Sequence, residues 1–125
     1  MFADRQATAM LPAADVERAK AWYKDKLGLT PAEEMGEMGA VYHLNGVRAF
    51  LYKSDYAGTA EHTVLTFDSP DLVADMAALR AKGVTFIDYD LPGIKTQNGL
   101  ADFGDMKNAW AKDSEGNILA FVQGM

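Results

Sequence analysis

Residues 40–53 read AVYHLNGVRAFLYK, with two apolar runs on either side of the dipeptide Asn45-Gly46. Asn-Gly favours the left-handed dihedral angles of a two-residue turn, and runs of this composition are typical of strands. We therefore predict a β-hairpin with strands at 40–44 and 47–53. A weaker strand is expected at 30–35, before the glycines at 36 and 39.

An amphipathic helix is predicted upstream of this hairpin. Apolar residues recur at helical spacing at Val16, Ala19, Tyr23 and Leu27. Asp15 is a favourable N-cap residue, and Gly28 is typical of the position that ends a helix. A short strand at 7–11, ended by Pro12, is expected before the helix.

The same order of elements returns in the second half of the chain. We expect a strand at 62–67, a helix capped by Ser69 with Pro70 in its first position, and strands at 84–89, 108–112 and 118–123. Gly83 is expected to stop the helix, and residues 113–117 to form the last turn. The pattern strand, helix, strand, strand, strand therefore occurs twice.

This repeat predicts an α+β fold made of two βαβββ modules, at about 6–56 and about 60–124, within a single domain of residues 1–125. The mixed sheet is expected to curve around a cleft, with the helices on the outside. A cleft lined by alternate residues of several strands is a favourable site for a small molecule.

Composition narrows the range of functions. The chain of 125 residues carries a net charge of −6, which disfavours a nucleic-acid partner, and it contains no cysteine, which removes disulfides and thiol catalysis. The first residues include Asp4 and Arg5 and no long apolar run follows, so neither a signal peptide nor a membrane-spanning helix is expected. We expect a cytoplasmic protein without a membrane partner.

Two motifs connect the repeat to a known group of proteins. The first is DVERA at 15–19, which leads to Trp22-Tyr23 and then to the LGL run at 27–29; the second is KDSEGNIL at 112–119. In this order and spacing they resemble the vicinal oxygen chelate superfamily of glyoxalase I, extradiol dioxygenases, and fosfomycin and bleomycin resistance proteins. The resemblance extends from about Ala7 to Gln123, and it implies the same fold and favours a homodimer.

Enzymes of this superfamily usually hold a divalent metal with His, Gln or Glu side chains at four inward strand positions. The resemblance places these positions at Thr8, Phe50, His62 and Ala120. Only His62 is a suitable ligand, with Gln6 as the one neighbour that could join it, and a lone imidazole cannot replace the hydration shell of a divalent ion. We therefore expect no metal and no other cofactor, with a divalent metal as the alternative.

Strand alternation places further side chains on the inner face together with Phe50. The expected ligand-binding residues are Thr8, Tyr42, Arg48, Phe50, Tyr52, His62, Trp110 and Ala120. For Tyr42 and Trp110, stacking on a flat ligand and packing in the core both remain open. The region between Tyr89 and Asn108, with Asp90, Lys95 and Asp102, is expected to form a lid.

These observations favour a small-molecule binding protein of the bleomycin resistance type that holds an apolar or aromatic ligand without a metal. One alternative is a metal-dependent lyase, isomerase or dioxygenase that uses His62. The other is a metal-free enzyme with His62 or Asp90 as general base. The sequence leaves open whether the cup forms within one chain or by exchange between two.

Overall fold

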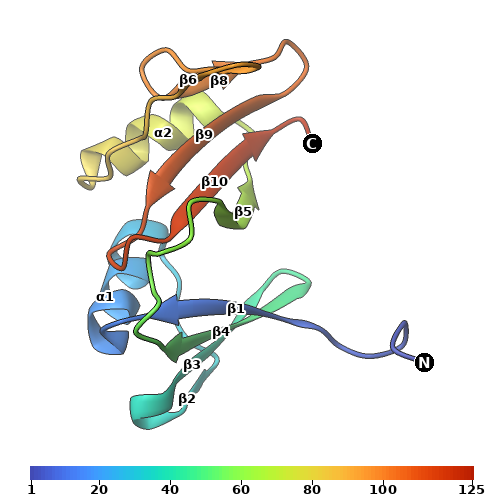
Figure 1. Cartoon of the computed structure of the whole chain (residues 1–125), viewed down its shortest axis with the longest axis vertical. Coiled ribbons are helices and arrows are strands. Elements are labelled where there is room, and N and C mark those ends of the chain that lie inside the picture. Colours follow the sequence, from blue (N-terminus) through green and yellow to red (C-terminus); the bar gives the residue numbers. More distant parts are fainter.

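The chain forms two four-stranded mixed sheets, each associated with one helix (Figure 1). The computed structural model describes all residues, 1–125. The first sheet has the order β1-β4-β3-β2 and the second the order β5-β10-β9-β8. In each sheet the first strand pairs with the last in parallel, and the remaining pairs are antiparallel. The predicted α+β class and the repeated βαβββ order are confirmed.

The bounds of the elements follow the chain. The first half contains β1 (Thr8–Ala13), α1 (Val16–Leu27), β2 (Glu33–Glu34), a short 3-10 helix (Gly36–Met38), β3 (Gly39–Leu44) and β4 (Val47–Lys53). The second half contains β5 (Thr63–Asp68), α2 (Leu72–Ala81), β6 (Asp90–Leu91), β7 (Ile94–Lys95), β8 (Leu100–Asp102), β9 (Lys107–Lys112) and β10 (Ile118–Gln123).

Local sequence signals account for the first half. Asn45 and Gly46 have φ angles of 36° and 93°, as a tight hairpin turn requires, and β3 and β4 pair on either side of them. The carboxylate of Asp15 accepts a hydrogen bond from the backbone N–H of Arg18 at 3.0 Å and caps α1. Gly28 ends this helix with a φ of 70°.

Three local predictions are wrong. Pro12 does not end β1, since the strand continues to Ala13; a proline is tolerated there because β1 lies at the edge of its sheet. The N-cap of α2 is Asp71 and not Ser69, because the Asp71 carboxylate accepts from the N–H of Ala74 at 3.2 Å. Residues 84–89 form only an isolated bridge from Phe86 to β9, and β8 takes the expected place of a strand beside β9.

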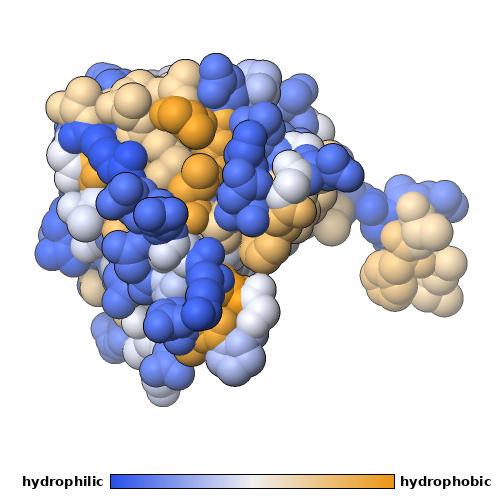
Figure 2. Space-filling view, turned by 90° about the horizontal axis from the view of Figure 1, so that it is seen from above, coloured by the Kyte–Doolittle hydropathy of each residue, from blue (hydrophilic) through white to orange (hydrophobic).

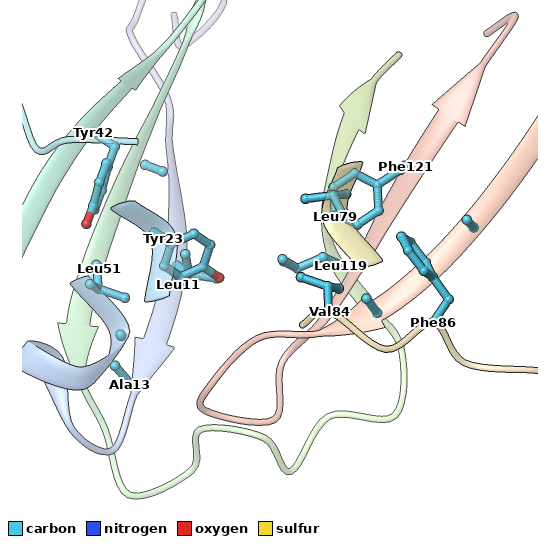
Figure 3. Close-up of a cluster of buried hydrophobic side chains, with 14 of the residues drawn as sticks. Leu11, Ala13, Tyr23, Tyr42, Leu51, Leu79, Val84, Phe86, Leu119 and Phe121 are labelled. Atoms are coloured by element: carbon cyan, nitrogen blue, oxygen red, sulfur yellow. The ribbon is translucent and has the colours of Figure 1, made fainter. Parts of the chain in front are cut away.

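Each sheet has one face turned toward the core and one face that carries no helix. In β4 the side chain of Leu51 is fully buried, whereas its neighbours Phe50 and Tyr52 point the other way and are half-buried. The helix-side residues of both halves belong to one cluster of 18 buried residues. Figure 3 shows Tyr23 and Leu51 of the first half and residues of the second half in this cluster, between the two sheets.

Within one chain, the helices therefore lie on the sides of the sheets that meet at the core, whereas helices outside a common cleft were expected. The helix-free faces of the two sheets, which we call the bare faces, consequently point away from that core. The segment before β1 extends from the body of the molecule, and its Phe2 is 74% exposed (Figures 1 and 2). No helix has the length and apolar character needed to cross a membrane.

The turn at 113–117 joins the two halves. The carboxylate of Glu115 accepts hydrogen bonds from the backbone N–H of Asp15 and from the guanidinium of Arg18, at 2.8 to 3.0 Å. The side-chain amide of Asn117 donates to the carbonyl of Pro12 at 2.7 Å. In the same network the hydroxyl of Tyr23 donates to the carboxylate of Asp113. The last turn of the second half is thus anchored to β1 and α1 of the first.

The ion pair of this turn predicts a stability that falls in acid. The Arg18 guanidinium lowers the pKa of Glu115 from 4.5 to about 2. A carboxyl whose folded-state pKa is depressed stabilises the fold above its unfolded pKa, and this contribution is lost as pH falls from 4.5 toward 2. Between pH 5 and pH 2 we expect the wild type to lose roughly 2–3 kcal/mol more of its free energy of unfolding than Glu115→Gln.

Urea denaturation across this pH range measures the difference. Glu17→Gln is the matched control, because Glu17 is an exposed side chain that pairs with Lys20 on the surface of α1. It should keep the pH dependence of the wild type. Equal pH dependence in the wild type and in Glu115→Gln would contradict the assigned role of this carboxylate.

Candidate ligand-binding site

The bare face of the first sheet presents its side chains in rows across neighbouring strands. Met10 of β1 and Val41 of β3 lie beside Phe50 of β4. One row further along β4, Tyr52 follows, and the ring centroids of Phe50 and Tyr52 are 6.3 Å apart. These two rings, half-buried in the single chain, form an aromatic wall. The structure therefore brings Phe50, Tyr52, Arg48 and Thr8 to one face, as the sequence predicts.

The bare face of the second sheet carries a second aromatic group. Trp110 of β9 lies beside Ala120 of β10, which is buried under its neighbours at 3% exposure. The ring of Tyr89 meets the Trp110 ring edge-on, with centroids 5.2 Å apart. The small side chain of Ala120 leaves the space beside the indole to these rings. Trp110 and Ala120 thus lie where the sequence places them, and Tyr89 is an addition to this face.

Tyr42 lies on the opposite side of its strand and does not face the ligand side. It is 3% exposed, belongs to the buried cluster and packs against Tyr23, with ring centroids 6.3 Å apart. Burial raises the pKa of its hydroxyl, which finds no hydrogen-bond partner. The pairing of Tyr42 with the buried Ala49 fixes this orientation, so Val41, and not Tyr42, corresponds to Trp110 in the repeat.

His62 lies just before β5 and is exposed. Its Nδ1 is 3.0 Å from the carbonyl oxygen of the next residue, Thr63. No group of three or more His, Cys, Asp or Glu side chains is arranged to hold a metal ion. The other three positions that the resemblance assigns to metal ligands offer a hydroxyl, a phenyl ring and a methyl group, so this donor set does not fit a divalent ion.

The expected lid contains a small hairpin. Strands β6 and β7 pair through Asp90 and Lys95, whose charged atoms are 3.8 Å apart at the surface. Asp102 ends β8 at the edge of the second sheet, and an open hollow of about 580 Å³ lies between it and the hairpin. Asp90 is exposed and has only this long pairing, so nothing in its surroundings favours it as a general base.

Asp88 anchors this hairpin and was missed in the sequence. Its carboxylate accepts hydrogen bonds from the hydroxyl of Thr96 at 2.8 Å and from the backbone N–H of Gly99 at 2.7 Å. These bonds lower the pKa of Asp88. The one signal in the sequence is an acidic residue between two apolar ones, Ile87 and Tyr89, which by itself indicates an exposed strand position.

Two open hollows border the bare face of the first sheet. A cleft of about 530 Å³ lies between the β3–β4 hairpin and the edge strand β5, lined by residues that include His43, Val47 and Thr66. A smaller hollow of about 320 Å³ is lined by Gln6, His43, Gly46, Val47 and Arg48. Both are large enough for a small organic molecule, and both open to the surface.

The paired βαβββ modules, with their aromatic bare faces, define a class of small α+β proteins that bind or transform small molecules. The model of the Glyoxalase/Bleomycin resistance protein/Dioxygenase superfamily matches residues 5–121, and this chain belongs to that superfamily. Comparison with the curated proteins finds no match.

Solved structures share the fold at low sequence identity. UcmS2 superposes with a TM-score of 0.74 at 21% identity, over 94% of this chain and 96% of the other. TnmS3, an antibiotic binding protein from Streptomyces sp. CB03234, gives a TM-score of 0.67 at 22% identity, over 100% and 99%. A lactoylglutathione lyase from Agrobacterium tumefaciens gives 0.73 at 13%, over 97% and 94%. The same fold therefore occurs in a binding protein and in an enzyme.

Removal of the Asp88 anchor should loosen the β6–β7 hairpin without unfolding the protein. Asp88→Ala deletes the acceptor of two hydrogen bonds, and the hairpin has few other attachments to the sheet. We expect faster amide hydrogen exchange at residues 88–99 and unchanged exchange in β10. Asp102→Ala, at another exposed carboxylate, is the control. Equal exchange at 88–99 in the wild type and in Asp88→Ala would show that the anchor is dispensable.

Proposed function

We propose that this protein is a metal-free binding protein for an apolar or aromatic small molecule. One observation carries the proposal: the bare faces present Phe50, Tyr52 and Trp110 at positions accessible to a ligand. Aromatic rings bury large apolar areas with few rotatable bonds, and they hold flat ligands by stacking. TnmS3 is an antibiotic binding protein, so binding of an organic compound by this fold has a precedent.

The absence of a cofactor follows in this proposal from the chemistry of the donor set. A divalent ion of the zinc or iron type needs several nitrogen, oxygen or sulfur ligands that converge on one point. Of Thr8, Phe50, His62 and Ala120, only His62 supplies a strong donor. The enzymatic alternatives gain no support from His62 or Asp90, since both side chains are exposed. The cytoplasmic location expected from the sequence stays a prediction.

A second copy of the chain completes the cavity in this proposal. The bare faces of one chain point away from its shared core, so the two aromatic walls do not enclose a common space. Strand β1 is an edge of the first sheet and β5 an edge of the second, and each has unpaired backbone groups. In a homodimer, β1 of one copy lies near β5 of the other, and two unlike bare faces then face one ligand.

The mass of the protein in solution tests this arrangement. Light scattering after size-exclusion chromatography, and native mass spectrometry, should give twice the chain mass of 13.6 kDa. Met10→Asp places a charge on the bare face of β1, where the side chain is 51% exposed, and should shift the equilibrium toward monomer. Val73→Asp, on the exposed side of α2, should not. A monomeric wild type at micromolar concentration would contradict the proposal.

Binding of a neutral aromatic compound tests the site itself. Titration calorimetry with 2-naphthylacetamide should detect binding, and Phe50→Ala should weaken it by roughly tenfold, because truncation of the ring removes about 1–2 kcal/mol of apolar contact. Tyr56→Ala is the control, since Tyr56 is 79% exposed in the connection between the halves. Equal affinity of the wild type and Phe50→Ala would exclude this face as the site.

A further inference from the structure

Three polar side chains form a row across the bare face of the first sheet. Thr8 of β1 and His43 of β3 both lie directly beside Arg48 of β4, which is between them. Neighbouring strands are about 5 Å apart, so the row spans about 10 Å. It lies beside the aromatic wall, two residues from Phe50 along the same strand.

The guanidinium of Arg48 is held in one orientation and is not neutralised. Its Nε donates a hydrogen bond to the hydroxyl oxygen of Thr8 at 2.7 Å. No salt bridge of the molecule involves Arg48. The two terminal NH₂ groups are therefore free to donate in parallel, and a carboxylate is the acceptor whose two oxygens match this spacing.

The surroundings of Arg48 favour an anion although the protein as a whole is acidic. The hollow of about 320 Å³ beside it is lined by Gln6, His43, Gly46, Val47 and Arg48, and none of these is acidic. The chain carries a net charge of −6, so an arginine without an acidic partner is a notable departure from the average surface. An anion bound in this hollow would meet a cation and hydrogen-bond donors.

The aromatic wall begins one row away. Phe50 and Tyr52 follow Arg48 on the same face of β4, at about 7 Å and 13 Å along the strand. A molecule whose carboxylate contacts Arg48 can therefore lay a flat ring system of one or two rings over Phe50. All these groups belong to one chain, so this part of the site does not depend on a second copy.

The geometry points to a carboxylate subsite formed by Arg48, positioned by Thr8, in the proposed ligand cavity. The ligand class is then an aromatic or apolar carboxylic acid, bound through its carboxylate at Arg48 and its ring at Phe50. This inference rests on the proposed function and specifies the chemistry of its ligand. Arg48 is a ligand-contacting residue here, and Thr8 acts through Arg48 as a positioning residue.

Matched compounds and matched variants test the subsite. We compare 2-naphthylacetate with 2-naphthylacetamide, which has nearly the same shape without the charge, by titration calorimetry at low salt. The wild type should bind the carboxylate roughly ten- to a hundredfold more tightly than the amide. Arg48→Gln should abolish this preference and leave the affinity for the amide within about threefold of the wild type. Arg48→Lys, which keeps the charge but loses the paired donors, should retain part of it.

The control variant is Lys24→Gln, which removes one positive charge from the exposed side of α1 and should keep the full preference. The melting temperatures of all variants confirm that they fold. Equal binding of the two compounds to the wild type, or a preference that survives in Arg48→Gln, overturns the carboxylate subsite and leaves the proposed function intact. Failure of both compounds to bind overturns the proposed function and this inference together.

Discussion

The ion pair between the buried carboxylate of Glu115 and Arg18 is the constraint on which the arrangement of the two halves depends. Glu115 lies in the last turn of the chain, Arg18 in the first helix, and the side chain of Glu115 has no exposed surface. A carboxylate buried in this way is stable only with its charge and lone pairs satisfied, and Arg18, Asp15 and Ser114 satisfy them. The same turn reaches β1 through Asn117. One short segment therefore fixes the orientation of the second sheet relative to the first.

This orientation has a cost and a use. Because the helix sides of both sheets share one core, the apolar area of two small modules is combined in a cluster that neither could build alone. The remaining faces point outward and keep aromatic and apolar side chains such as Phe50, Met10 and Trp110 accessible. Accessible apolar surface of this kind is typical of sites for ligands or for other subunits. Here both uses apply to the same surface.

Much of the fold can be predicted from the sequence, because its signals are local. Asn45-Gly46 and the Asp15 cap specify their turns through short-range sterics and hydrogen bonds, and both are confirmed. The orientation of Tyr42 could not be predicted, because a shift of one residue in strand register exchanges the faces and apolar residues stand on both sides of it. The anchor at Asp88 depends on partners 8 and 11 residues away in a loop, and no periodic pattern indicates such contacts. The expected strand at 84–89 failed because β8 occupies the sheet edge there.

The alternation along β4 separates two tasks within one strand. Ala49 and Leu51 are sealed in the interior, where a change of volume would cost stability, while Arg48, Phe50 and Tyr52 project from the other side and contribute little to the core. Mutations at the second set can alter what the protein recognises without first requiring compensation for folding. The strand thus gives evolution a surface on which specificity can drift while the scaffold stays intact, which suits an architecture shared by binding proteins and enzymes.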